Sequence, residues 1–153
     1  ALLEPEIARR NVHTVVRLGE IPLTVNCDAD QIEQVFVNLI MNALDAMQHA
    51  GGTLRITAPA QNDRDRVMIA FEDTGVGVAP EHEARLFAPF FTTKEPGKGT
   101  GMGLAVSQSI VREHGGEITF SSTPAGSRFV VAIPMAASET IDHEPGSREQ
   151  RTA

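Results

Sequence analysis

The sequence predicts an α+β domain, a two-layer sandwich in which helices cover one face of a mixed, mainly antiparallel sheet. Two observations carry this prediction. Most predicted strands occur as neighbouring pairs joined by turns, not in the strict strand–helix–strand order of a parallel sheet. The 153 residues also hold one long helical pattern with an apolar stripe and two shorter helical segments, which suit helices that lie on such a sheet, and they contain no internal repeat.

The first predicted pair of strands comprises residues 12–18 and 23–27, with a turn at Gly19 and Pro22 between them. The single cysteine, Cys27, cannot form an internal disulfide. Because it follows an alternating apolar and polar run, we expect it to be a small core residue and not a nucleophile.

A long helix should follow, capped by Asp28 or Asp30, running to about Ala50 and stopped by the glycines at 51–52. Its apolar residues recur at three- and four-residue intervals, as in a helix stripe that faces a core. These residues are Ile32, Val35, Phe36, Leu39, Ala43 and Met47.

The rest of the chain contributes four more strands and two more helices. The predicted strands are 53–58, 66–72, 117–122 and 127–134, and the predicted helices are 81–87 and 102–114. From residue 136 on, polar, charged and helix-breaking residues dominate. We therefore expect one domain at 1–135 and a disordered tail at 136–153.

Composition and charge exclude several classes of protein. The hydrophobic content of 41% and charged content of 22% are ordinary for a soluble domain, and no apolar run is long enough to span a membrane. A net charge of −7 argues against general nucleic-acid binding. The five scattered histidines argue against a zinc site. The sequence begins with Ala1 and shows no signal peptide, and we expect it to be a segment of a longer protein.

A glycine-rich segment predicts a phosphate-binding loop. Four of the seven residues at 97–103 are glycine, and a helical pattern follows them. Glycine allows several backbone N–H groups to point into one concavity, and the positive N-terminal end of a helix faces the same place. The spacing fits neither a Walker A loop nor a dinucleotide-binding turn. A flexible linker is the alternative interpretation.

Two further segments indicate a polar cavity. Gln34, Asn38, Asn42 and Asp45 lie on one stripe of the first long helix, and an asparagine amide oxygen is a suitable Mg²⁺ ligand. Asp73 ends a predicted strand beside Gly75 and Gly77, where its carboxylate could accept from the amine of adenine. The alternatives are asparagines bonded to nearby backbone and an ordinary Asp-x-Gly turn.

Together these segments resemble the GHKL ATPases, over about residues 28–134. Residues 38–43 (Asn-Leu-Ile-Met-Asn-Ala) resemble the N box and residues 73–77 (Asp-Thr-Gly-Val-Gly) the first glycine box. Residues 87–94 resemble the F box, and residues 99–104 the second glycine box. The Thr-Thr-Lys ending of the F box is similar to that of sensor histidine kinases. The resemblance implies the Bergerat (GHKL) fold with a mobile ATP lid, here residues 88–101, which we call the lid.

The resemblance also implies a role for each motif residue. Asp73 would bind the adenine amine, Asn42 would hold Mg²⁺ and Asn38 would line the triphosphate site, with Lys94 reaching the phosphates. We accordingly predict Asn38, Asn42 and Lys94 as the catalytic residues. The full predicted ATP site is Asn38, Asn42, Asp73, Gly75, Gly77, Lys94, Gly99, Thr100, Gly101, Met102, Gly103 and Leu104. Asp45 has no predicted role beyond helix solubility.

The function implied is that of the catalytic and ATP-binding domain of a two-component sensor histidine kinase. Gyrase-type and chaperone-type relatives carry a glutamate where this chain has Asn38, so no general base for ATP hydrolysis is expected here. A phosphoacceptor histidine is also not expected within the chain. The alternatives are a non-catalytic nucleotide-binding GHKL module and a GHKL ATPase.

The same resemblance implies partners and a location. The expected partners are ATP, the dimerisation and phosphoacceptor domain of the same kinase and, through that domain, a response regulator. We expect no nucleic acid and no membrane contact by this segment, and a cytoplasmic location.

Overall fold

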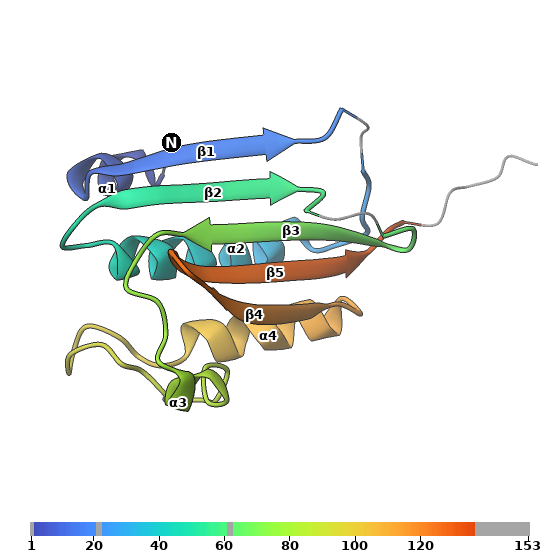
Figure 1. Cartoon of the computed structure of the whole chain (residues 1–153). Coiled ribbons are helices and arrows are strands. Elements are labelled where there is room, and N and C mark those ends of the chain that lie inside the picture. The colour runs from blue at the N-terminus through green and yellow to red at the C-terminus, as the bar shows by residue number, and fades with distance from the viewer. Residues whose placement is uncertain (1, 21–22, 61–62, 137–153) are drawn as a thin grey trace, which may run out of the picture.

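The computed structural model describes residues 2–20, 23–60 and 63–136. They form a five-stranded sheet in the order β1-β2-β3-β5-β4, with α2 and α4 side by side on one face (Figure 1). The strands are β1 (Val12–Leu18), β2 (Gly52–Ala58), β3 (Arg66–Asp73), β4 (Glu117–Thr123) and β5 (Gly126–Pro134). The helices are α1 (Glu4–Arg9), α2 (Ala29–Ala46), α3 (Pro80–Glu83) and α4 (Gly103–Glu113). The predicted fold class is confirmed.

Strand pairing differs from the prediction at the start of the chain. Strand β1 pairs with β2 in parallel, from Val12 opposite Gly52 to Leu18 opposite Ala58, and the other three pairs are antiparallel. The expected hairpin of 12–18 with 23–27 is wrong, because residues 23–27 form no strand. Their alternating pattern has another cause: Val25 packs against the core, and the Thr24 carbonyl accepts from Ala136 N–H at 2.8 Å. Cys27 is exposed, so its predicted place in the core is wrong as well.

Helix α2 begins where its sequence predicts. The Asp28 carboxylate accepts from the N–H groups of Asp30 and Gln31 at 3.1 and 3.2 Å, which makes Asp28 the N-cap. His114, just after α4, accepts the Asp28 N–H at 3.0 Å through Nε2 and so joins the end of α4 to the start of α2. The helix ends at Ala46, four residues before the predicted end, and residues 47–50 continue as turns.

The core lies between the sheet and the two long helices. Helix α2 contributes most of its predicted stripe, and Val35 and Leu39 are almost fully buried. Phe71 of β3 and Phe129 of β5 pack beneath the helices, with the Phe71 and Phe36 ring centroids 5.4 Å apart. This packing fixes the face of α2 that turns away from the core, and that face carries Asn38, Asn42 and Asp45.

Three smaller elements differ from prediction. Helix α1 was missed, although Pro5 in its first turn and its flanking charges are typical of a helix start. The helix predicted at 81–87 is shorter, Pro80–Glu83, and continues as turns. The predicted tail from 137 lies outside the described residues. No helix in the described part of the chain is both long and apolar enough to cross a membrane.

Candidate functional site: a nucleotide cavity between α2 and the lid

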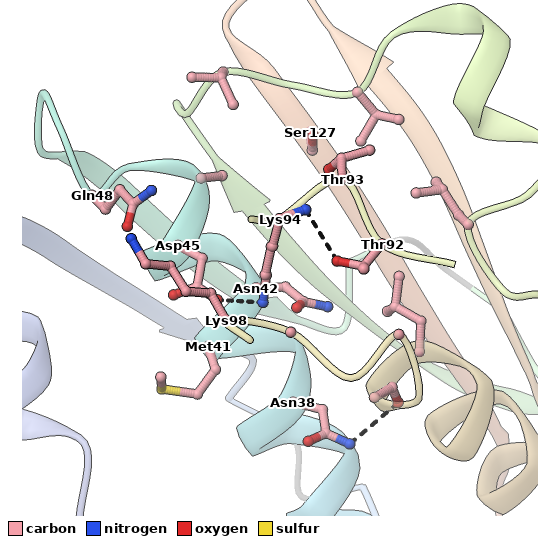
Figure 2. Close-up of a pocket in the computed structure, with 18 of the residues that line it drawn as sticks. Asn38, Met41, Asn42, Asp45, Gln48, Thr92, Thr93, Lys94, Lys98 and Ser127 are labelled. Carbon is pink, nitrogen blue, oxygen red and sulfur yellow. Dashed lines mark hydrogen bonds and ion pairs between the residues drawn. The ribbon is translucent and has the colours of Figure 1, made fainter. Parts of the chain in front are cut away.

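A cavity of about 660 Å³ lies between α2, the lid and the adjoining ends of β3 and β5 (Figure 2). It contains most of the predicted site. The predicted residues that line it are Asn38, Asn42, Asp73, Gly77, Lys94, Gly99, Thr100, Gly101, Gly103 and Leu104. Gly75 and Met102 are not among its lining residues. The motifs, which lie up to 66 residues apart in sequence, therefore meet in one place.

Gly75 lies next to the cavity, where the loop after β3 packs against the end of α2. An added Cβ at Gly75 would lie 2.6 Å from the carbonyl oxygen of Ala46, at the end of α2. The next residue, Val76, donates its N–H to the same carbonyl at 3.1 Å. The glycine is therefore required for the close approach of the β3 loop to α2.

Asn38 links α2 to α4. Its amide nitrogen donates to the Gly103 carbonyl at 3.3 Å and to the buried Ser107 hydroxyl at 3.1 Å. Because the amide nitrogen makes both contacts, the oxygen on the other branch of the side chain is the atom left to interact with a ligand (Figure 2). The alternative that Asn38 bonds to nearby backbone is wrong, because its two partners, one backbone carbonyl and one hydroxyl, belong to α4.

Asn42 lies one helical turn further along α2 and lines the same cavity. Its amide has no hydrogen-bond partner among the described residues. These residues also contain no group of three or more histidine, cysteine, aspartate or glutamate side chains that could hold a metal ion. An amide oxygen together with ligand oxygens and water is the donor set that Mg²⁺ accepts in nucleotide sites.

Asp73 is a buried carboxylate that lines the same cavity, with 6% of its surface exposed. Burial raises the pKa of Asp73, while hydrogen bonds from the backbone of Gly75 and Ser127 oppose the shift. The Gly75 N–H donates to Oδ1 at 2.9 Å. A buried acceptor facing a cavity is suited to the exocyclic amine of a purine. Leu86 and Phe129 add apolar surface beside it.

The lid is shaped by two residues with positive φ and by hydrogen bonds between residues close in sequence. Phe90 has φ +64 and Gly101 φ +69, and an added Cβ at Gly101 would lie 2.4 Å from the backbone carbon of Phe90. Thr92 Oγ1 accepts from Lys94 N–H at 3.1 Å, and Thr100 Oγ1 accepts from Met102 N–H at 3.3 Å. Gly101 is thus a glycine for reasons within the lid itself.

Gly103 begins α4, an 11-residue helix whose N-terminal end faces the cavity. The nearest atom to an added Cβ at Gly103 is Asn38 Cγ, at 3.8 Å, an ordinary contact distance. The protein alone therefore leaves room for a side chain at Gly103. The first N–H groups of a helix and its positive end favour an anion at this position.

The cavity lining also contains residues that were not in the predicted site, among them Arg10 and Asp45. Arg10 follows α1, and its guanidinium donates to Asp45 Oδ1 at 2.5 Å. Lys94 of the lid forms an ion pair with Asp45 Oδ2 (Figure 2). The expectation that Asp45 serves only helix solubility is therefore wrong. The regular spacing of Asp45 after Asn38 and Asn42 was the available signal, whereas nothing in the sequence marked Arg10.

Comparison with known proteins identifies the family of the chain. Residues 27–137 match the family described as histidine kinase-, DNA gyrase B- and HSP90-like ATPases, and the chain belongs to this family. It is 42% identical over 119 residues to the two-component sensor PprA of Pseudomonas aeruginosa, across 75% of this chain and 13% of PprA. It is 35% identical over 137 residues to the sensor histidine kinase ZraS of Salmonella typhimurium, across 89% of this chain and 29% of ZraS. The chain thus spans less than a third of the length of these relatives.

Solved structures show the same fold. The nucleotide-free catalytic domain of histidine kinase ThkA superposes with a TM-score of 0.75 and 32% identity, covering 87% of this chain and 86% of that domain. Full-length ShkA in complex with AMPPNP gives a TM-score of 0.76 and 26% identity, covering 90% of this chain and 28% of ShkA. The chain is therefore a histidine kinase-type ATPase domain.

Proposed function

We propose that this domain binds ATP with Mg²⁺ in the cavity between α2 and the lid and, within a longer sensor histidine kinase, donates the γ-phosphoryl group to a histidine. The observation that carries the proposal is the arrangement of one cavity. A buried acceptor, Asp73, the amides of Asn38 and Asn42, and the glycine-rich lid all line it.

Each group in the cavity has a distinct part in this proposal. Asp73 accepts from the adenine amine, and Asn42 supplies an amide oxygen to Mg²⁺, which neutralises phosphate charge when bound. The N-terminal end of α4 at Gly103 and the lid residues Gly99 and Thr100 hold the phosphates through backbone N–H groups. Lys94 adds a positive charge. Phosphoryl transfer depends mainly on such positioning and charge stabilisation.

The identity of Asn38 favours transfer to a partner over hydrolysis. An amide is no general base, and the nitrogen of Asn38 is already bonded to Gly103 and Ser107. The acceptor we propose is an imidazole nitrogen on a helical dimerisation domain of the same kinase. The bond between the γ-phosphorus and the bridging oxygen of ATP breaks, a phosphorus–nitrogen bond forms, ADP leaves and the imidazole loses a proton.

The partner and location that we propose are based on the relatives named above. A solved ThkA structure contains its response regulator TrrA, and we propose that a response regulator takes the phosphoryl group from the dimerisation domain here as well. Because the donor is cytosolic ATP, we place the domain in the cytoplasm. The longer protein can still carry a membrane anchor.

Calorimetric titration with ATP and GTP, with and without Mg²⁺, tests the nucleotide site. ATP should bind more tightly than GTP, because guanine presents a carbonyl to Asp73. The Asp73→Asn variant should lose about 1.5–3 kcal/mol of ATP binding, the range for a hydrogen bond to a charged group. Asn42→Ala should lose affinity only when Mg²⁺ is present. Equal affinity for the two nucleotides, or equal loss in EDTA, would contradict these assignments.

The chain joined to the helical hairpin of its own kinase tests the reaction. Acid-labile phosphate should appear on a hairpin histidine, and none should appear on the isolated domain. Binding without transfer would identify a non-catalytic nucleotide-binding module. Release of inorganic phosphate by the isolated domain would instead identify an ATPase.

A further inference from the structure

A chain of alternating charges runs from α1 into the cavity. Glu6 of α1 pairs with Arg10 at 3.4 Å, Arg10 pairs with Asp45 of α2 at 2.5 Å, and Asp45 pairs with Lys94 of the lid. The last three residues line the cavity. Three segments far apart in the sequence are therefore joined through one carboxylate, as the Asp45–Lys94 part of Figure 2 shows.

Asp45 poses an electrostatic problem in a site for a polyanion. It lies one turn beyond Asn42, and its side chain is only 24% exposed. Although partial burial acts to raise the pKa of Asp45, the pairs with Arg10 and Lys94 outweigh burial and hold the pKa below its ordinary value. The residue therefore stays ionised, and an unneutralised carboxylate here would repel phosphate.

The two cations that neutralise Asp45 are not equivalent. Lys94 is 34% exposed, lies on the lid and ends in a compact ammonium on a flexible stem. Arg10 is 16% exposed, lies between Glu6 and Asp45 and presents a planar guanidinium to both. Lys94 can therefore move with the lid, whereas Arg10 is held by the junction of α1 and β1.

Building on the proposed nucleotide site, we propose that Asp45 exchanges partners when a nucleoside triphosphate binds. Lys94 leaves Asp45 for the phosphates, and Arg10 stays and keeps the carboxylate neutralised. Arg10 and Asp45 are thus positioning residues of the nucleotide site, and the segment before β1 is part of that site. In the empty protein, the anionic partner of Lys94 is the Asp45 carboxylate. When nucleotide binds, phosphate replaces Asp45 as that partner.

The test compares ATP with adenosine, which shares the base but has no phosphate. In the chain as it stands, Arg10→Gln should weaken ATP binding by about twofold to fivefold, a change of the size expected for one partly exposed charge pair, and leave adenosine binding unchanged. Arg10→Lys keeps the charge and should bind ATP nearly as the wild type does. Arg9→Gln is the matched control: it makes the same charge change at a side chain that is 68% exposed and pairs only with Glu6 among the described residues.

The decisive variant is the double change Arg10→Gln with Asp45→Asn. If Arg10 acts by neutralising Asp45, removing the carboxylate should restore ATP affinity to at least the wild-type value. If the double variant binds as weakly as Arg10→Gln alone, Arg10 contacts the phosphates itself and the exchange is wrong. If adenosine binding falls as well, Arg10 has a structural role and the exchange is again wrong. No binding of ATP by the wild-type chain would overturn the proposed function, whereas normal ATP binding by Arg10→Gln would overturn the exchange alone.

Discussion

Helix α2 and the lid are two walls of the same cavity, but different interactions hold them in place. Helix α2 is anchored by a buried apolar stripe and a carboxylate N-cap. The lid has positive φ angles at Phe90, Gly97 and Gly101, of which only that of Phe90 is strained, and Phe90 is 77% exposed. Its link to α2 through Asp45 is a single ion pair.

Because of this difference, we expect α2 to determine the stability of the domain and the lid to determine how the domain responds to a ligand. Burying the apolar stripe of α2 fixes the fold whether or not nucleotide is present. The lid buries little apolar surface to offset its ordering entropy, so ligand contacts should decide its order. Helix α2 therefore holds Asn38 and Asn42 in place without a ligand, and we expect the lid to close when nucleotide binds.

The largest expected effect comes from breaking the rigid wall. Leu39→Ala removes a side chain that is 1% exposed in the main core and should lower the free energy of unfolding by about 2–5 kcal/mol. Urea denaturation measures this loss. Leu23→Ala is the control at a 40% exposed leucine and should change it by less than about 0.5 kcal/mol. Equal losses would mean that α2 is not the anchored element.

Two glycine variants distinguish the shape of the lid itself from contact between the protein and a ligand. Gly103→Ala has room in the empty protein and should keep its unfolding free energy, yet place a methyl group against the phosphates and weaken ATP binding by about 1–3 kcal/mol. Gly101→Ala should distort the lid itself, because alanine disfavours φ +69 by about 1–2 kcal/mol and its Cβ meets the Phe90 backbone. Titration of ATP and amide exchange of the empty proteins distinguish the two. Normal ATP binding by Gly103→Ala would contradict the assigned phosphate position.

The pH dependence of stability should have opposite signs at two aspartates. Burial raises the pKa of Asp73 above its ordinary value of 3.8, so the stability from its protonated form is present below 3.8 and is lost as pH rises through the folded-state pKa. Asp73→Asn should therefore be at least as stable as the wild type at pH 7, and the difference should shrink toward pH 4. Urea denaturation across this range gives the comparison.

Asp63 provides the control for this sign. The N–H of Asp65 lowers the pKa of Asp63, so its stabilising effect is present at neutral pH and is lost as pH falls through the folded-state pKa. Asp63→Asn should thus be less stable than the wild type at pH 7. The same sign at both sites would show that the burial of Asp73 does not govern its ionisation.

The smallest effect should be seen in the wild-type protein itself. Adding Mg-ATP should slow amide exchange in residues 92–101 more than in strand residues 67–72, all of which are already paired with β5 and the last three also with β2. Mass spectrometry of exchanged peptides resolves the two segments, and adenosine should protect the lid less than ATP does. If the lid amides already exchange slowly in the empty protein, α2 and the lid do not differ in order as we expect.

The sequence by itself determined the elements whose patterns are local. The stripe from Ile32 to Met47 predicted α2, and because its buried side was clear, the spacing of Asn38 and Asn42 placed both on the side that lines the cavity. The glycine spacing and the Asp73 turn predicted a nucleotide site through their likeness to known motifs. Each of these signals lies within a few residues, where helix and strand geometry fix which side chains share a face.

Tertiary structure alone decided which distant segments meet. Strand β1 pairs with β2, which follows α2 in the sequence, and not with residues 23–27. The sequence of a strand does not by itself show which strand it pairs with. Asp45 meets Arg10 and Lys94, which are 35 and 49 residues away, so its role could not be found from its helix. Gly75 and Gly101 are glycines because the backbones of Ala46 and Phe90 approach them closely. Such approaches arise only when the packed core brings the elements together, because nothing in a local pattern encodes the position of a distant backbone.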